Sequence, residues 1–197
     1  LLEEFQGIVT YDQYVVAFLE LMRQPYTGCN PRGMMISRDK PLSKQILAYH
    51  RIPTAKFALL PRNRRFRVPG RLKFPLFVKS ATEDASLGIS QASIVHDAHK
   101  LKERVEFIHE QTHSDALVEE YTEGREIYIG LTNDEPFGPV ITFGAGGTMI
   151  ELIADQAMEL PPLNQFLAHR LIERARVAET LGHWRGSPPV KMEALEQ

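Results

Sequence analysis

Short apolar runs that end at charged or small polar residues alternate along this chain with longer stretches of helical periodicity. Residues 74–78 are mostly apolar, aromatic or β-branched, the run stops at Lys79, and small polar residues follow until apolar alternation resumes after Gly88. This pattern predicts a strand, a loop and a second strand. Four consecutive apolar residues at 57–60 predict a further strand.

Residues 116–130 repeat the pattern with more charge. Three apolar residues meet Glu119 and Glu120, a turn is expected at 123–124, and alternation resumes at Glu126. We therefore predict a hairpin of two strands that carries several carboxylates. From the residues alone, this is either an exposed hairpin kept soluble by its acidic side chains or a pair of strands that present carboxylates to a ligand.

Apolar residues at spacings of three and four predict four helices. These are 12–22 with Asp12 as N-cap, 41–50 with Pro41 in the first turn, 96–113, and 164–181 with Asn164 as N-cap. Strands are predicted at 140–143 and 149–153, and the glycine-rich turn 144–147 between them needs positive φ or close backbone approach. That turn is either a hairpin connection or a place where backbone amides approach phosphate.

Composition and charge narrow the class of protein. Of the 197 residues 43% are hydrophobic and 24% charged, as in ordinary globular domains. A net charge of -2 gives no general attraction to nucleic acid or to an anionic membrane, and no apolar run has the length of a membrane span. Residues 61–73 are rich in arginine, which indicates a nucleic-acid patch or a solvated connection; the acidic overall balance favours the connection.

Cysteine and histidine provide little evidence for a metal or redox site. Cys29 is the only cysteine, which excludes an internal disulfide and fits a reducing cytoplasm; a reactive thiol is the alternative, although no base is near it in sequence. His109 and His113 have the spacing of a metal-binding pair on one helix face. Without a third ligand, surface histidines are the favoured interpretation.

Lys79 is the first candidate for chemistry. An ammonium at the point where a strand opens into a loop can meet phosphate oxygens as a point charge, while the hydroxyls of Thr82 and Ser86 and the loop amides donate hydrogen bonds. A solvated lysine at a strand end is the alternative that the residue type allows.

Taken together, these stretches resemble the ATP-grasp enzymes of the D-alanine:D-alanine ligase-like branch. The resemblance covers about residues 1–132 and includes the motifs at 25–30, 37–44 and 52–54. It implies an α+β fold in which two α+β subdomains with mostly antiparallel sheets grip ATP. It further implies a remnant of an N-terminal domain at 1–36, a first subdomain at 37–118, and a second at 119–197 that lacks the last metal-binding strand.

The resemblance implies phosphate contacts in the first subdomain. Lys40 and Lys79 would contact the nucleotide phosphates, and the loop 81–88, with Ser86 and Gly88, would close over them. This loop departs from the glycine and serine richness of the family because it carries two acidic residues. Negative charge beside a triphosphate is unfavourable unless a metal or a lysine offsets it.

Adenine and ribose contacts are implied for the segment that follows. Glu119 would accept a hydrogen bond from the exocyclic amine of adenine, and the backbone of Tyr121 and Thr122 would present the remaining adenine contacts. Glu126 would hold the ribose hydroxyls.

The remainder of the chain resembles a second branch, the ATP-grasp domain of the ADP-forming acyl-CoA synthetases and related protein acetyltransferase fusions. This resemblance covers about residues 133–197. It rests on the motifs at 137–147, 151–155, 160–164 and 185–190. Both branches have a turn like the one at 123–126, and we infer that the chain joins parts of two branches, by natural recombination, by design or as a chimera.

In such ligases a carboxylate attacks the γ-phosphate of ATP. The protein contributes mostly by positioning the reactants and by neutralising charge with lysine and Mg²⁺. Both branches supply magnesium ligands from a late strand with a carboxylate and an asparagine, and we do not find that motif before Gln197. Glu151 and Asp155 are the carboxylates near the expected metal region, where each is either a metal ligand or a solvated strand-end residue. No catalytic residue is assigned.

The sequence therefore predicts the ATP-binding domain of a carboxylate-activating, ADP-forming ligase in the cytoplasm. Its ligands would be ATP, Mg²⁺ and a small carboxylate, with neither nucleic acid nor membrane as a partner. A second copy of the chain or a missing companion domain stays open as a partner. The alternatives are a fragment of an ADP-forming acyl-CoA synthetase subunit and a non-catalytic nucleotide-binding or scaffold hybrid.

Overall fold

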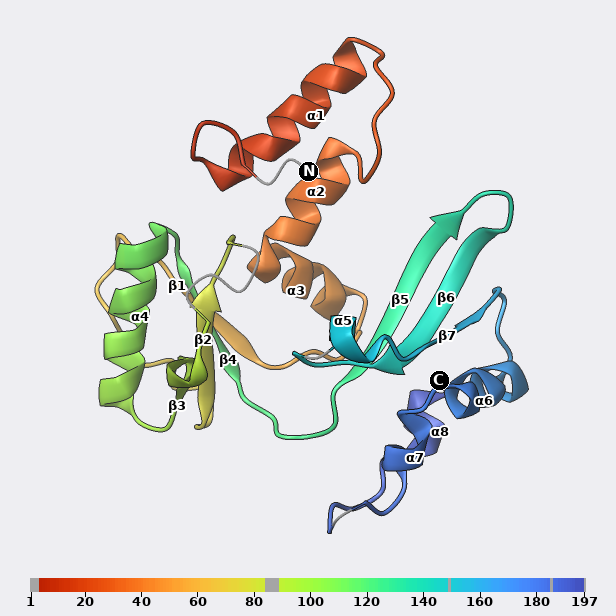
Figure 1. Cartoon of the computed structure of the whole chain (residues 1–197). Helices are drawn as coiled ribbons and strands as arrows, with labels where there is room; N and C mark the ends of the chain where they lie inside the picture. Colours follow the sequence, from red (N-terminus) through yellow and green to blue (C-terminus); the bar gives the residue numbers. More distant parts are fainter. Residues whose placement is uncertain (1–3, 84–88, 149, 185, 197) are drawn as a thin grey trace. The chain divides into compact units, whose positions relative to one another are not determined.

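The chain forms two compact units in a computed structural model (Figure 1). The structure describes residues 4–83, 89–148, 150–184 and 186–196. The units are Leu1–Thr122 and Glu123–Gln197. They divide a few residues after the predicted boundary at 118–119, and the three-part division of the sequence stays a prediction.

The first unit combines a small sheet with helices. Its helices are α1 Asp12–Leu21, α2 Pro31–Arg38, α3 Lys40–Tyr49 and α4 Ala98–Thr112. Its strands are β1 Phe57–Leu60, β2 Leu76–Ser80, β3 Ile94–Val95 and β4 Ala116–Glu120. Short 3-10 helices lie at Val9–Tyr11 and Gln91–Ser93. The strand order is β1-β4-β2-β3, and each neighbouring pair is antiparallel.

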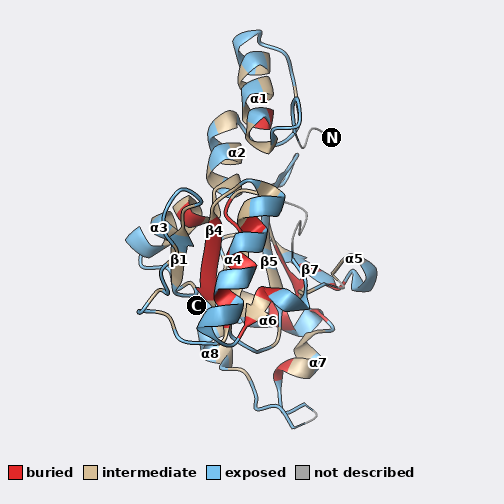
Figure 2. Ribbon diagram, turned by 90° about the vertical axis from the view of Figure 1, so that its left-hand side faces the viewer, coloured by how far each residue is buried: buried red, intermediate tan, exposed pale blue. Residues whose placement is uncertain are grey.

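Helix α4 covers one face of this sheet. Apolar side chains of the sheet and the helix form one buried cluster, made of Leu76, Val78, Val95, Leu101, Val105, Ile108, Ala116 and Val118. Figure 2 shows β4 buried along most of its length and α4 exposed on its outward side. Because side chains alternate along a strand, the residues between the cluster positions of β2 and β4 face away from α4.

Helix α3 begins as the sequence predicts. Asp39 is the N-cap, and its side-chain oxygen accepts a hydrogen bond from the Leu42 N–H at 2.9 Å. Pro41 lies in the first turn, where its missing N–H costs nothing. This start places Lys40 and Lys44 one turn apart on the same side of the helix.

The prediction that Asp12 caps α1 is wrong. Asp12 is the first residue of α1, its side chain is buried, and its carboxylate accepts from the guanidinium of Arg38 at the end of α2. A buried carboxylate is stable only with such a partner, so this pair joins the two N-terminal helices.

The second unit contains a three-stranded antiparallel sheet in the order β5-β6-β7. The strands are β5 Ile127–Asp134, β6 Gly138–Ala145 and β7 Gln156–Glu159, and the helices are α5 Ile150–Ile153, α6 Gln165–Arg174, α7 Ala178–Leu181 and α8 Met192–Leu195. Phe143 and Ala157 of the sheet pack against Leu171, Ile172 and Leu181 of the helices.

Three sequence predictions are corrected here. β4 pairs with β1 and β2, and β5 pairs with β6, so 116–130 is not a hairpin. Residues Ile150–Ile153 form the helix α5 rather than a strand, and the next strand is β7. The helix predicted at 164–181 is interrupted between α6 and α7. Alternation did not fix the pairing partner of β4 or distinguish the short helix α5 from a strand, and helical spacing did not show the break between α6 and α7, because tertiary packing decides these features.

Among the described residues, no helix combines the length and the apolar character that crossing a membrane requires.

Candidate functional site

Glu119 lies at the centre of the sheet of the first unit, on the face opposite α4. Its neighbour Val118 is in the core cluster, so the alternation of β4 turns Glu119 to the other face. The register places Glu119 directly opposite Phe57 of β1 and Phe77 of β2. Glu119 is only 8% exposed, so its carboxylate needs partners within the protein.

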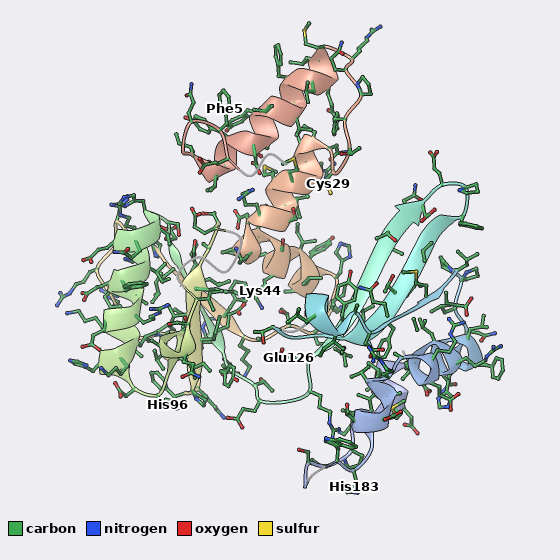
Figure 3. All side chains as sticks on the ribbon, in the orientation of Figure 1. Phe5, Cys29, Lys44, His96, Glu126 and His183 are labelled. Atoms are coloured by element: carbon green, nitrogen blue, oxygen red, sulfur yellow. The ribbon has the colours of Figure 1, made fainter. Side chains whose placement is uncertain are left out.

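Two lysines supply those partners. Lys79 Nζ lies 2.9 Å from Glu119 Oε2, and Lys44 Nζ lies 2.8 Å from Glu119 Oε1. Lys79 comes from β2 and Lys44 from α3; Figure 3 labels Lys44. Lys44 also lies 5.5 Å from the ring centre of Phe57, and Lys79 lies 5.9 Å from that of Phe77. The carboxylate is therefore held between two ammonium groups, each of which rests over an aromatic ring.

The charge state of Glu119 follows from two opposing effects. Burial raises the pKa of the Glu119 carboxyl, whereas hydrogen bonding and attraction from Lys44 and Lys79 lower that pKa. The lysines outweigh burial, so the pKa lies below that of an ordinary glutamate and the group is ionised at neutral pH.

This shift predicts an acid-dependent stability. Because the folded pKa of Glu119 lies below the unfolded value of about 4.3, its contribution is present above that pH and is lost as pH falls through the folded pKa. We expect the difference in unfolding free energy between the wild type and Glu119→Gln to be largest above about pH 5 and to shrink below about pH 4. Urea unfolding at several pH values measures this difference in free energy. Glu110→Gln is the control, because Glu110 is exposed. A difference that stays constant with pH would contradict the ion-pair account.

Lys40 joins the start of α3 to the segment that follows β2. Its Nζ donates to the Glu83 carbonyl oxygen at 2.5 Å, and its backbone N–H donates to the Ala81 carbonyl oxygen at 3.2 Å. The Ser80 hydroxyl oxygen accepts from the N–H groups of Thr82 and Glu83, so this segment is a compact turn.

These contacts place Lys40 beside the beginning of the predicted phosphate loop. Ser86 and Gly88 lie outside the described residues. Phosphate contacts by Lys40 and Lys79 therefore stay a prediction, although the contacts of Lys79 disfavour the solvated alternative.

Tyr121 and Thr122 follow β4 at the edge of the same face. The Tyr121 N–H donates to the Pro75 carbonyl oxygen at 3.0 Å, and its ring stacks on Phe77 with the centroids 6.4 Å apart. Pro75 has no N–H with which to return a hydrogen bond to the Tyr121 carbonyl oxygen. That carbonyl is therefore the backbone group of Tyr121 better suited to an outside donor, while Thr122 is exposed.

Glu126 belongs to the second unit, where it lies against the glycine-rich segment. The Gly146 N–H donates to the Glu126 carbonyl oxygen at 2.9 Å. A Cβ added at Gly147 would lie 2.3 Å from Glu126 Oε2, and Gly147 has a φ of +87°. The predicted need for positive φ or close backbone approach is confirmed at Gly147 by its positive φ, whereas residues 144–145 belong to β6 rather than to a turn. The Glu126 side chain is exposed and is labelled in Figure 3. Its contact with the ribose hydroxyls stays a prediction.

Asp155 has a clear structural role. Its Oδ1 accepts from the Arg176 N–H and its Oδ2 from the Val177 N–H, both at 2.8 Å, and the residue is buried. These bonds stabilise the break between α6 and α7, which explains why the predicted single helix is interrupted. Glu151 lies in α5, and the described residues contain no cluster of three or more metal-ligating side chains. Metal binding by Glu151 and Asp155 stays a prediction.

Sequence reasoning missed Lys44 as a site residue. A signal was available, because Lys44 follows Lys40 by four residues on a predicted helix and so lies on the same helix face. The spacing alone did not show that this face meets the sheet beside Glu119.

Residues 37–197 match the model of the ATP-grasp domain family. This match includes more than half of the chain, and the chain therefore belongs to the ATP-grasp family. The α+β architecture with antiparallel sheets agrees with that assignment.

Among curated proteins, the uncharacterized protein y4sG of Sinorhizobium fredii is 33% identical over 162 residues, which is 81% of this chain and 46% of y4sG. A D-alanine–D-alanine ligase of Syntrophotalea carbinolica is 34% identical over 139 residues, 69% of this chain and 43% of the ligase. The chain thus spans less than half the length of these relatives.

Among solved structures, acetyl-coenzyme A synthetase 1 of Ca. Korarchaeum cryptofilum, in complex with coenzyme A and Ca-AMPCP, has a TM-score of 0.67 at 22% identity, covering 79% of this chain and 74% of that one. D-alanine–D-alanine ligase of Bacillus anthracis, complexed with ATP, has a TM-score of 0.57 at 23% identity, covering 86% and 57%. At these identities the likeness shows the fold. The resemblance to the D-alanine–D-alanine ligases is confirmed in sequence, and the likeness to the synthetase is one of fold.

Proposed function

We propose that this chain is the ATP-binding part of a carboxylate-activating, ADP-forming ligase. The observation that carries the proposal is the buried Glu119 carboxylate between Lys44 and Lys79, on the face of the sheet opposite α4. Relatives named as D-alanine–D-alanine ligases support the same class of reaction.

Each residue has a role in this proposal. An ionised carboxylate can only accept hydrogen bonds, so Glu119 suits the amine of adenine. The Tyr121 carbonyl oxygen lies at the same end of β4 and is a further acceptor. Lys40 and Lys79 would bind the phosphates, and Glu126 would accept hydrogen bonds from the ribose hydroxyls.

The reaction proposed for the whole protein is phosphoryl transfer. A carboxylate oxygen of the substrate attacks the γ-phosphorus, the bond from that phosphorus to the β,γ-bridging oxygen breaks, and ADP leaves with the electron pair. A nucleophile then resolves the acyl phosphate. The chain's own contribution is to bind and orient ATP and to place positive charge beside its phosphates.

Magnesium would supply further charge neutralisation in this reaction. The described residues do not form a site that fits it, because both oxygens of Asp155 already accept backbone N–H groups. Mg²⁺, the small carboxylate substrate and a cytoplasmic location stay parts of the proposal.

An ADP-forming acyl-CoA synthetase is the second candidate, favoured by the motifs of residues 137–164 and by the structural neighbour with the TM-score of 0.67. The two candidates share ATP binding and differ in the nucleophile, which is an amine in one and phosphate or coenzyme A in the other. Measurement of ADP release by the full-length protein with each nucleophile separates them.

Replacement of Glu119 tests the adenine contact. We expect Glu119→Ala to weaken ATP binding by about 1 to 3 kcal/mol, because a buried amine would lose its acceptor. Calorimetric titration with ATP measures the change. Glu110→Ala is the matched control, since Glu110 is exposed on α4 on the other face of the sheet. Equal affinity of the wild type and Glu119→Ala would remove Glu119 from the adenine site.

A further inference from the structure

Lys44 has a more fixed environment than Lys79. Three oxygen atoms surround its ammonium: Thr54 Oγ1 at 2.6 Å, Glu119 Oε1 at 2.8 Å and the Ala55 carbonyl oxygen at 3.4 Å. An ammonium has three N–H donors, so these oxygens match its full donor capacity. The side chain of Lys44 is 14% exposed, compared with 22% for Lys79.

If the chain binds ATP, both the Glu119 carboxylate and a phosphate group can pair with the Lys79 ammonium. In the structure its ammonium contacts Glu119 Oε2. In the proposed function the same ammonium binds phosphate, which carries more negative charge than one carboxylate. A shift of Lys79 towards the nucleotide would remove one of the two positive charges beside a carboxylate that is buried in the protein. An uncompensated buried charge is strongly unfavourable.

We propose that Lys44 is a positioning residue that keeps Glu119 ionised and oriented when Lys79 turns to the nucleotide, and that it thereby sets the preference for a purine with a 6-amino group. This inference rests on the proposed function. Lys44 can fulfil the role because Thr54 and Ala55 hold its ammonium independently of Lys79.

The preference follows from the chemistry of the two purine edges. An ionised carboxylate accepts from the 6-amino group of adenine and repels the 6-oxo group of hypoxanthine, which is an acceptor. A protonated carboxyl can donate to the 6-oxo group. Loss of the positive charge of Lys44 would favour the protonated form of Glu119, and the discrimination between the two bases would decrease.

The test compares ATP with ITP, which differ at this position of the base. We expect the wild type to bind ATP about fivefold or more tightly than ITP, since an unmatched buried polar group lowers affinity by about that factor or more. Lys44→Met keeps the length of the side chain but removes the charge. For this variant we expect the ATP preference to fall to about threefold or less at pH 6 and to be larger at pH 8, because the ionised fraction of a carboxyl increases with pH. Lys44→Arg, which retains the charge, should retain most of the preference.

The outcomes separate this inference from the proposed function. Absence of ATP binding by the folded wild type overturns the proposed function and the inference with it. If the wild type prefers ATP and Glu119→Gln abolishes that preference, but Lys44→Met retains it in full at both pH values, the role of Lys44 is wrong while the function stands. Urea unfolding shows whether each variant is folded. Should Lys44→Met not fold, Lys44→Gln is measured instead with the same expected result, and a full preference there overturns the proposal equally.

Discussion

Lys79→Ala is expected to lower the affinity for ATP by about 10- to 100-fold, because hydrogen bonds to charged groups contribute about 1.5 to 3 kcal/mol. The affinity for adenosine should change much less, since adenosine has no phosphate for the Lys79 ammonium to contact. Calorimetric titration of both ligands measures the two effects. The difference between them isolates the phosphate contact from any change in the adenine contact through Glu119.

Two comparisons make this prediction specific. Lys102→Ala removes an exposed lysine from α4 and should leave both affinities unchanged. Lys79 both pairs with Glu119 and, in the proposal, binds phosphate. Comparison of the double variant Lys79→Ala/Glu119→Gln with the two single variants gives the coupling energy between these residues, and so separates the two roles. Equal losses for ATP and adenosine in Lys79→Ala would exclude Lys79 from the phosphate site.

Asp155→Ala is expected to destabilise the protein by about 2 to 6 kcal/mol, because it leaves the N–H groups of Arg176 and Val177 without their acceptors at about 1 to 3 kcal/mol each. The loss should appear in urea unfolding and should be the same with EDTA present, since the account is structural. It should affect the second unit, which contains Asp155, Arg176 and Val177.

The control is Asp155→Asn, which keeps one side-chain oxygen as an acceptor and should cost less than Asp155→Ala. The experiment also tests the metal prediction for Asp155. Wild-type stability that rises with Mg²⁺, and an effect of Asp155→Ala that disappears in EDTA, would contradict the structural account and support a metal ligand.

The sequence predicted strands better than their partners. β1, β2 and β4 occur at the predicted short apolar runs, and α3 has the predicted proline in its first turn. The hairpin at 116–130 was wrong because β4 lies between β1 and β2 in the centre of one sheet, and β5 belongs to another. A turn signal in sequence identifies a change of direction, but it does not say whether the strands before and after it pair.

In the candidate site too, residues marked by local sequence features were found, whereas residues whose role depends on tertiary packing were missed. Glu119 and Lys79 were found from strand ends and from the resemblance to the ATP-grasp enzymes, and the structure brings these two residues into contact. Lys44 was missed because its role depends on how α3 packs beside β4. Asp155 was considered a metal candidate from residue type, whereas its contacts with 176–177 require the fold of the second unit.

The most direct test of the account is calorimetric titration of the 197-residue chain with ATP, with and without Mg²⁺. We expect saturable binding in the micromolar to millimolar range that Glu119→Ala and Lys79→Ala both weaken. Stronger binding with Mg²⁺ would show that the chain holds part of the metal site as well. If the chain unfolds cooperatively in urea, and is therefore folded, but binds no ATP under either condition, the proposed ATP binding is wrong.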